Sequence, residues 1–269
     1  MPEGHTVHRL AAEHRRVFGG APVRAESPQG RFAAGAARVD GRTLTDAQAH
    51  GKHLLLHFDD DRLVHVHLGI YGKHAFGPLP APAPVGAVRL RLTGAEQHAD
   101  LRGPGTCELL EPAGAAALLD RLGPDPLRAD ADPDRAHRRV ERSRTSVAVL
   151  LMDQSVVAGP GNIYRAEVLF RQGVHPDVPG RALGRDRWTA IWDDLRVLMA
   201  EGVRTGRIDT VRPEHTPEAM GRPPRVDDHG GEVYVYRRAG APCLVCGTPV
   251  ATRVVGGRNL FWCPGCQRA

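Results

Sequence analysis

Four of the five cysteines form two Cys-x-x-Cys pairs near the C-terminus, Cys243/Cys246 and Cys263/Cys266, with sixteen residues between them. Each pair can form a tight turn that offers two thiolates, and Zn²⁺ accepts four sulfur ligands in a tetrahedron. The spacing predicts a zinc ribbon with one structural zinc ion, which replaces the core that so short a segment cannot bury. The alternative, two unrelated dithiols or a pair of disulfides, does not explain the ligand spacing.

The segment around these cysteines is basic. Residues 233–269 contain no acidic residue, whereas residues 1–120 hold thirteen basic and thirteen acidic residues. The five arginines of this segment alone equal the formal net charge of the whole protein, which is +5. A polyanion is its expected partner. Its arginines are Arg237, Arg238, Arg253, Arg258 and Arg268.

Amine nucleophiles are scarce in this chain. Lys52 and Lys73 are its only lysines among thirty-six basic residues, and the N-terminus is the third amine. A mechanism that needs an amine to attack a carbon atom has only these candidates. The fifth cysteine, Cys107, lies in an apolar stretch and is expected to be a small core residue rather than a reactive thiol.

Composition indicates a globular protein. The chain has 269 residues, of which 41% are hydrophobic, enough for one large domain or two modest ones besides the ribbon. No run of eighteen apolar residues occurs, and the N-terminus lacks the apolar core of a signal peptide. We expect a cytoplasmic monomer without a membrane segment, and a reducing compartment also favours metal over disulfides.

The N-terminal half is predicted to be a β-sandwich with a leading helix. Apolar residues recur at helical spacing from Thr6, a candidate N-cap, to Phe18, where Gly19-Gly20 can end the helix. Short segments rich in Val and Leu follow, separated by turn-forming stretches. They cover residues 52–58, 63–68, 85–92 and 106–110, and a proline-rich loop is expected at 77–86.

The second half is predicted to be helical before the ribbon. Helical periodicity covers residues 113–122, 146–153, 163–172 and 187–205, and Trp188 and Trp192 are expected in a core rather than stacked on bases. A glycine-rich turn at 157–162 enters a helix, where it could present backbone N–H groups to an anion or simply redirect the chain. We predict three domains, 1–122, 123–228 and 229–269, with a proline-rich linker at 213–228.

Four ordered motifs together resemble one family, the bacterial formamidopyrimidine-DNA glycosylases and endonucleases VIII of base-excision repair. They are Met1-Pro2-Glu3-Gly4, Gly51-Lys52-His53-Leu54, Gly161-Asn162-Ile163-Tyr164, and Gly257-Arg258 with Phe261-Trp262-Cys263-Pro264. The resemblance spans the chain and looks closer to the actinobacterial endonuclease VIII branch. The sequence departs from the family at Thr6, where a glutamate is often found.

The resemblance implies an α+β multidomain fold: an N-terminal catalytic β-sandwich, a helix-two-turn-helix DNA-binding domain and a C-terminal β-hairpin zinc finger that grips DNA. It assigns Pro2 and Glu3 to catalysis, and Lys52, Asn162 and Arg258 to the phosphates. An apolar wedge must fill the gap left by an extruded nucleotide. Ile70 and Tyr71 look like that wedge, and Arg102 is a further candidate.

The residues themselves suit this chemistry. Removal of Met1 would expose the secondary amine of Pro2, and an α-amine with a pKa near 8 is roughly one-tenth neutral at pH 7. Such an amine can attack the C1′ atom of a sugar and become an iminium, while Glu3 moves protons at the sugar ring. His65 and His67 alternate on a predicted strand and are interpreted as structural residues rather than as a metal pair.

These features predict a nucleoid-associated bifunctional DNA glycosylase and abasic-site lyase, which removes oxidised pyrimidines from double-stranded DNA by β,δ-elimination. One alternative is an oxidised-purine glycosylase of the same family, because both branches share every motif above. The other is a non-catalytic, zinc-dependent DNA-binding protein, as expected if Met1 is retained, because an acylated Pro2 nitrogen cannot be a nucleophile.

Overall fold

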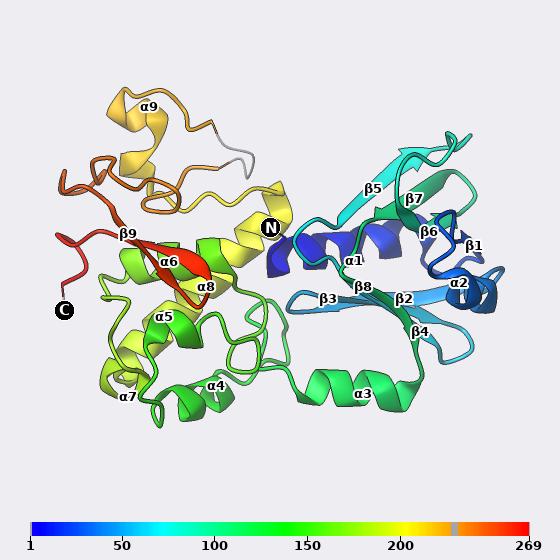
Figure 1. The fold of residues 1–269 in the computed structure, drawn as a ribbon, viewed down its shortest axis with the longest axis horizontal. Coiled ribbons are helices and arrows are strands. Elements are labelled where there is room, and N and C mark those ends of the chain that lie inside the picture. Colours follow the sequence, from blue (N-terminus) through cyan, green and yellow to red (C-terminus); the bar gives the residue numbers. More distant parts are fainter. Residues whose placement is uncertain (1, 227–230, 269) are drawn as a thin grey trace. The chain divides into compact units, whose positions relative to one another are not determined.

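A computed structural model describes residues 2–226 and 231–268. It divides into two compact units, Met1–Arg121 and Leu122–Ala269, which are described separately. The predicted β-sandwich with a leading helix, the helical segment and the C-terminal hairpin are all confirmed (Figure 1). No helix among the described residues is long and apolar enough to cross a membrane.

The first unit contains two four-stranded antiparallel sheets. One has the order β2-β3-β4-β8 and the other β1-β6-β7-β5. The first comprises β2 (Leu44–His50), β3 (His53–Phe58), β4 (Leu63–His67) and β8 (Thr106–Leu110). The second comprises β1 (Arg24–Glu26), β6 (Val88–Thr93), β7 (Gln97–Arg102) and β5 (Lys73–Pro78).

Helix α1 (Gly4–Phe18) shares one core with both sheets, because its stripe Val7, Ala11 and Phe18 packs among their inward-facing apolar residues. The expected N-cap at Thr6 is wrong. Glu3 occupies that position with extended backbone, and the Thr6 amide donates to its carbonyl. The unit is completed by α2 (Ala33–Val39) and by α3 (Pro112–Asp120), which covers Leu55 and Leu63 on the outer face of the first sheet.

The second unit is built around α6 (Asn162–Arg171) and α8 (Arg185–Thr205). Trp188 and Trp192 are buried in its core with ring centroids 6.2 Å apart, which confirms the prediction for both. Arg171 joins the two helices through a bidentate ion pair to Asp194, at 2.8 and 2.7 Å. Shorter helices surround them: α4 (Pro133–Val140), α5 (Val147–Leu150), α7 (Gly180–Leu183), η1 (Pro213–His215) and α9 (Pro217–Met220).

The ribbon belongs to the same unit as these helices. Strands β9 (Ala251–Val255) and β10 (Arg258–Trp262) form an antiparallel hairpin. The two turn residues, Gly256 and Gly257, have φ values of 57° and 72°. Left-handed backbone of this kind suits glycine and lets a two-residue turn follow the twist of the strands.

Several elements differ from the sequence prediction. Strands β1, β2, β5 and β7 and helix α2 were not expected, and β5 extends into the stretch predicted as a loop at 77–86. The predicted linker at 213–228 contains η1 and α9, and its residues 227–228 lie outside the described part of the chain.

Candidate functional site

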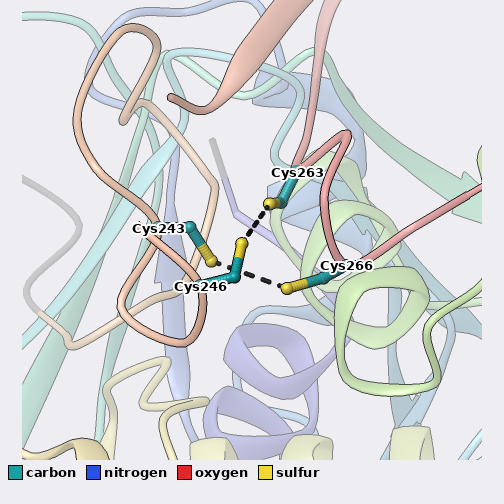
Figure 2. Close-up of side chains that lie close together, drawn as sticks. All are labelled: Cys243, Cys246, Cys263 and Cys266. Carbon is teal, nitrogen blue, oxygen red and sulfur yellow. Dashed lines mark hydrogen bonds between the residues drawn. The ribbon is translucent and has the colours of Figure 1, made fainter. Parts of the chain in front are cut away.

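The four clustered cysteines form the metal centre. Their sulfur atoms all lie within 4.8 Å of one another, with 3.4 Å between Cys246 and Cys263 and 3.8 Å between Cys243 and Cys266 (Figure 2). Four sulfurs about 2.3 Å from a zinc ion lie roughly 3.8 Å apart at tetrahedral angles. The donor set therefore fits one structural zinc ion, and no other cluster of three ligand residues occurs in the described ranges.

Asn162 and Arg258 come from distant parts of the sequence but lie on connected elements. Asn162 begins α6, directly after the extended N-cap Gly161, as the glycine-rich turn predicted. Its Nδ2 atom donates a 3.0 Å hydrogen bond to the carbonyl of Asn259, the neighbour of Arg258 at the start of β10. The start of a helix and the turn of the zinc hairpin therefore form one polar surface, with Arg258 exposed.

Two charged residues one turn into α6, Arg165 and Glu167, are buried and were missed from the sequence. Arg165 is 2% exposed, and its guanidinium donates to the Asn162 side chain. Glu167 is fully buried and accepts hydrogen bonds from the backbone N–H groups of Tyr234, Val235 and Tyr236 at 2.7 to 2.9 Å. A buried carboxylate needs such donors. A glutamate within an otherwise apolar stretch of α6 was the available signal.

Pro2 and Glu3 lie at the start of α1. Glu3 is only 1% exposed, whereas Pro2 is half-buried. The C-terminal end of α1 is fixed to the beginning of β2, because the Gly20 N–H donates to the Leu44 carbonyl and Arg15 to that of Ala47. The start of α1 accordingly lies at the end of the unit where β2 turns into β3 (Figure 1).

Lys52 occupies that turn with Gly51, between β2 and β3. The register pairs His53 of β3 with His67 at the end of β4. Burial and then the charges of His65 and Lys52 lower the pKa of His67, so Lys52 lies within electrostatic reach of this strand end.

The proposed wedge leaves the sheet at the same end. Ile70 and Tyr71 follow β4 and form an adjacent pair of exposed apolar side chains, at 59% and 83%. Arg102 ends β7 and is committed elsewhere: it donates to Asp100 at 2.6 Å and to the Val85 carbonyl at 3.1 Å. Pro2, Glu3, Lys52, Ile70 and Tyr71 therefore gather around one end of the sheet β2-β3-β4-β8 and of α1, and the register pairs Arg102 with Lys73, two residues after Tyr71.

Cys107 is an unreactive thiol, and one of the two strand histidines is engaged by a carboxylate. Burial raises the pKa of the Cys107 thiol to about 12, so it is not a reactive thiolate. His65 and His67 lie on the same face of β4, and His65 is hydrogen-bonded to the Glu108 carboxylate at 2.8 Å.

The sequence matches three domain families in order. They are the formamidopyrimidine-DNA glycosylase N-terminal domain at residues 1–107, the formamidopyrimidine-DNA glycosylase H2TH domain at 122–213, and a zinc finger found in FPG and IleRS at 240–269. Endonuclease 8 1 of Mycobacterium tuberculosis (strain ATCC 25618 / H37Rv) is 51% identical over 271 residues, with 99% of this chain and all of the relative covered. The chain belongs to the formamidopyrimidine-DNA glycosylase and endonuclease VIII family of base-excision repair.

More distant relatives carry the other family name. The formamidopyrimidine-DNA glycosylase of Alkalilimnicola ehrlichii is 34% identical, covering 100% of this chain and 99% of the relative. A crystal structure of the Lactococcus lactis Fpg in complex with abasic-site DNA has the same fold, with a TM-score of 0.80 at 24% identity and coverage of 99% and 100%.

Proposed function

We propose that this DNA glycosylase is bifunctional, excising oxidised pyrimidines and then cutting the strand through a covalent intermediate on Pro2. The observation that carries the proposal is the pairing of Pro2 with the buried Glu3 at the start of α1, at the same end of the unit as the Lys52 turn. An amine beside a carboxyl group protected from water provides both a nucleophile and a proton donor.

Once Met1 has been removed, the lone pair of the Pro2 nitrogen bonds to C1′ of the damaged nucleotide, and the bond between C1′ and the base breaks. The base leaves with the bonding electrons and takes up a proton from solvent, while the Pro2 nitrogen loses its own N–H proton to solvent. Glu3 gives a proton to the ring oxygen as the sugar opens to an iminium. Loss of the C2′ proton then expels the 3′ phosphate, and a second elimination expels the 5′ phosphate. Hydrolysis of the remaining adduct restores the amine.

The remaining residues would hold the DNA. Lys52 is suited to the phosphate beside the lesion, and Asn162 and Arg258 to backbone phosphates at the zinc hairpin. The exposed pair Ile70 and Tyr71 would fill the gap in the duplex. Arg102 is the weakest candidate for the wedge because Asp100 and the Val85 carbonyl already engage its guanidinium.

The relative with 51% identity is named an endonuclease 8, which supports the pyrimidine preference. The relatives with 34% identity are named formamidopyrimidine-DNA glycosylases and favour an oxidised purine as the second candidate. Duplexes that each carry one lesion distinguish the two: faster release of thymine glycol than of 8-oxoguanine supports our assignment, and the reverse order contradicts it.

The nucleophile is tested by borohydride trapping on a duplex with an abasic site. A proline iminium is reducible, so the wild-type protein should become covalently linked, Pro2→Gly should weaken the link, and an uncleaved N-terminal tag should abolish it. Lys73→Ala, at the only other lysine, is the matched control for Lys52→Ala. Trapping that survives the tag but disappears in Lys52→Ala would transfer the role of nucleophile to Lys52.

A further inference from the structure

Three side chains form a hydrogen-bonded chain across the outer face of the sheet β2-β3-β4-β8. Glu108 of β8 is bonded to Nδ1 of His65 at 2.8 Å, and Nε2 of His65 is bonded to Nδ1 of His53 at 2.8 Å. The chain runs from a Glu108 side chain that is 50% exposed, through a His65 side chain that is 5% exposed, to the half-buried His53 beside Lys52.

The hydrogen bonds dictate the tautomers. An ionised carboxylate can only accept, so Nδ1 of His65 carries a proton and donates it to Glu108. In a neutral His65 ring Nε2 then has no proton and accepts from Nδ1–H of His53. The Nε2 atom of a neutral His53 is consequently left with a lone pair, as an acceptor that cannot bind a phosphate oxygen.

One added proton reverses this polarity. An N–H bond forms at Nε2 of His53 with a proton from solvent, while the Nδ1 proton of His53 moves to Nε2 of His65. His53 is again neutral, but its outer nitrogen is now a donor. The positive charge resides on His65, next to the Glu108 carboxylate that stabilises it. The three hydrogen-bonded side chains thus convert an acceptor beside Lys52 into a donor, and the added charge resides on the next residue of the series, His65.

The surroundings of His53 oppose a positive charge on its own ring in the free protein. His50 of β2, His67 of β4 and Arg121 after α3 all face His53, together with His65, and Lys52 is its sequence neighbour. Burial, followed by these positive or protonatable neighbours, lowers the pKa of His53 to about 3. A phosphate anion would counteract the repulsion, so its arrival favours proton uptake.

The three hydrogen-bonded side chains end close to the residues proposed to contact DNA. His53 pairs with His67, their rings lie 5.1 Å apart, and both the Lys52 turn and the exposed loop with Ile70 and Tyr71 leave the sheet at this pair. We propose that His53 is a second phosphate ligand beside Lys52, loaded with one proton through His65 and Glu108 when DNA binds. This inference rests on the proposed function, because it assumes that Lys52 faces the DNA backbone.

The test is the number of protons taken up on binding a duplex with a tetrahydrofuran abasic analogue, which resists cleavage. Titration calorimetry at pH 6.5 in two buffers of different ionisation enthalpy measures that number. The wild type should take up close to one proton more than Glu108→Gln or His53→Phe. Its Kd should also tighten as the pH falls from 8 to 5, by at most tenfold per unit for one linked proton, with a shallower slope in both variants.

His57→Phe provides the matched control, since His57 is a half-buried histidine on β3 outside the chain, and it should behave as the wild type does. Circular dichroism and zinc content show that each variant is folded. Equal proton uptake in the wild type and in Glu108→Gln and His53→Phe overturns the proposal that His53 is loaded with a proton through His65 and Glu108. If these variants still form the borohydride-trapped complex, the proposed function survives that result, whereas a wild type that binds no abasic DNA overturns both.

Discussion

At the scale of single residues, the candidate site separates a nucleophile from a proton donor. Pro2 is half-buried and Glu3 is almost completely buried, although they are neighbours in the sequence. A helix that begins directly after Glu3 imposes this difference, because the N-cap residue is held against the unit while the residue before it is not.

Glu3→Gln should separate the two chemical steps. The amide keeps the shape of the side chain and removes its proton, so excision of an oxidised pyrimidine should fall by about a hundredfold or more, the usual scale of a lost general acid. Strand cleavage at an abasic site should persist, because no base has to leave and Pro2 can still attack the open-chain aldehyde. Gel assays of both substrates under single-turnover conditions measure the two rates.

Glu13→Gln is the control for that experiment, since Glu13 lies on the same helix and pairs with Arg16 on its surface. It should leave both rates unchanged. A misfolded Glu3→Gln protein would lose both activities together and bind abasic DNA weakly. Excision at the wild-type rate in Glu3→Gln would mean that another group supplies the proton.

At the scale of elements, the sequence predicted those features whose signal is local. Cysteine spacing located the zinc ribbon, 3.6-residue periodicity located α6 and α8, and the glycine-rich turn placed Asn162 at a helix start. Strand β2 was missed because only Leu44, Ala47 and Ala49 are buried and a bulge between Leu44 and Asp46 breaks the alternation.

Contacts between distant residues explain most of the remaining misses. Strand β7 looked polar, yet its Asp100 is buried because Arg91 of β6 pairs with it at 2.6 and 2.8 Å. Glu167 accepts from backbone groups 67 to 69 residues further along the chain, and Glu108 and His65 are 43 residues apart. No local pattern reveals such partners, so neither the contacts of Glu167 nor the histidine chain could be predicted from the sequence.

The ribbon should depend on its metal. Removing zinc with a strong chelator, or by Cys243→Ser, leaves a hairpin whose residues bury too little surface to stay folded. The carbonyl of Asn259 that holds Asn162 would then be lost, so DNA affinity should fall by at least tenfold at low salt, with the difference shrinking as salt rises. Binding titrations, with zinc content measured by a colorimetric chelator, test this.

Cys107→Ser is the matched control, because Cys107 is the one cysteine outside the cluster. It should retain one zinc ion and full affinity. A zinc-free protein that excises oxidised bases at the full rate would show that the ribbon is not needed to hold DNA.

At the scale of the whole molecule, charge is distributed unevenly along the chain. Residues 1–120 are balanced, and the basic excess is matched by the segment from residue 233 onward. Three arginines of that segment are already engaged: Arg253 is paired with Asp177, Arg238 donates to the carbonyls of Tyr234 and Pro242, and Arg268 donates to the carbonyl of Gly265. Arg258 is exposed at the turn next to Asn259 and is the best placed of the five to meet a phosphate.

This placement predicts how affinity responds to salt. Each phosphate contact releases condensed counterions, so the logarithm of the binding constant falls with the logarithm of salt concentration by roughly 0.9 per contact. Arg258→Ala should therefore weaken binding to abasic-analogue duplex and make this slope shallower by about one unit, without loss of zinc. Arg204→Ala removes the same charge from the surface of α8, where Arg204 pairs with Glu201, and should leave the slope unchanged. If both variants shift the slope equally, only the net charge of the protein matters and Arg258 makes no specific phosphate contact.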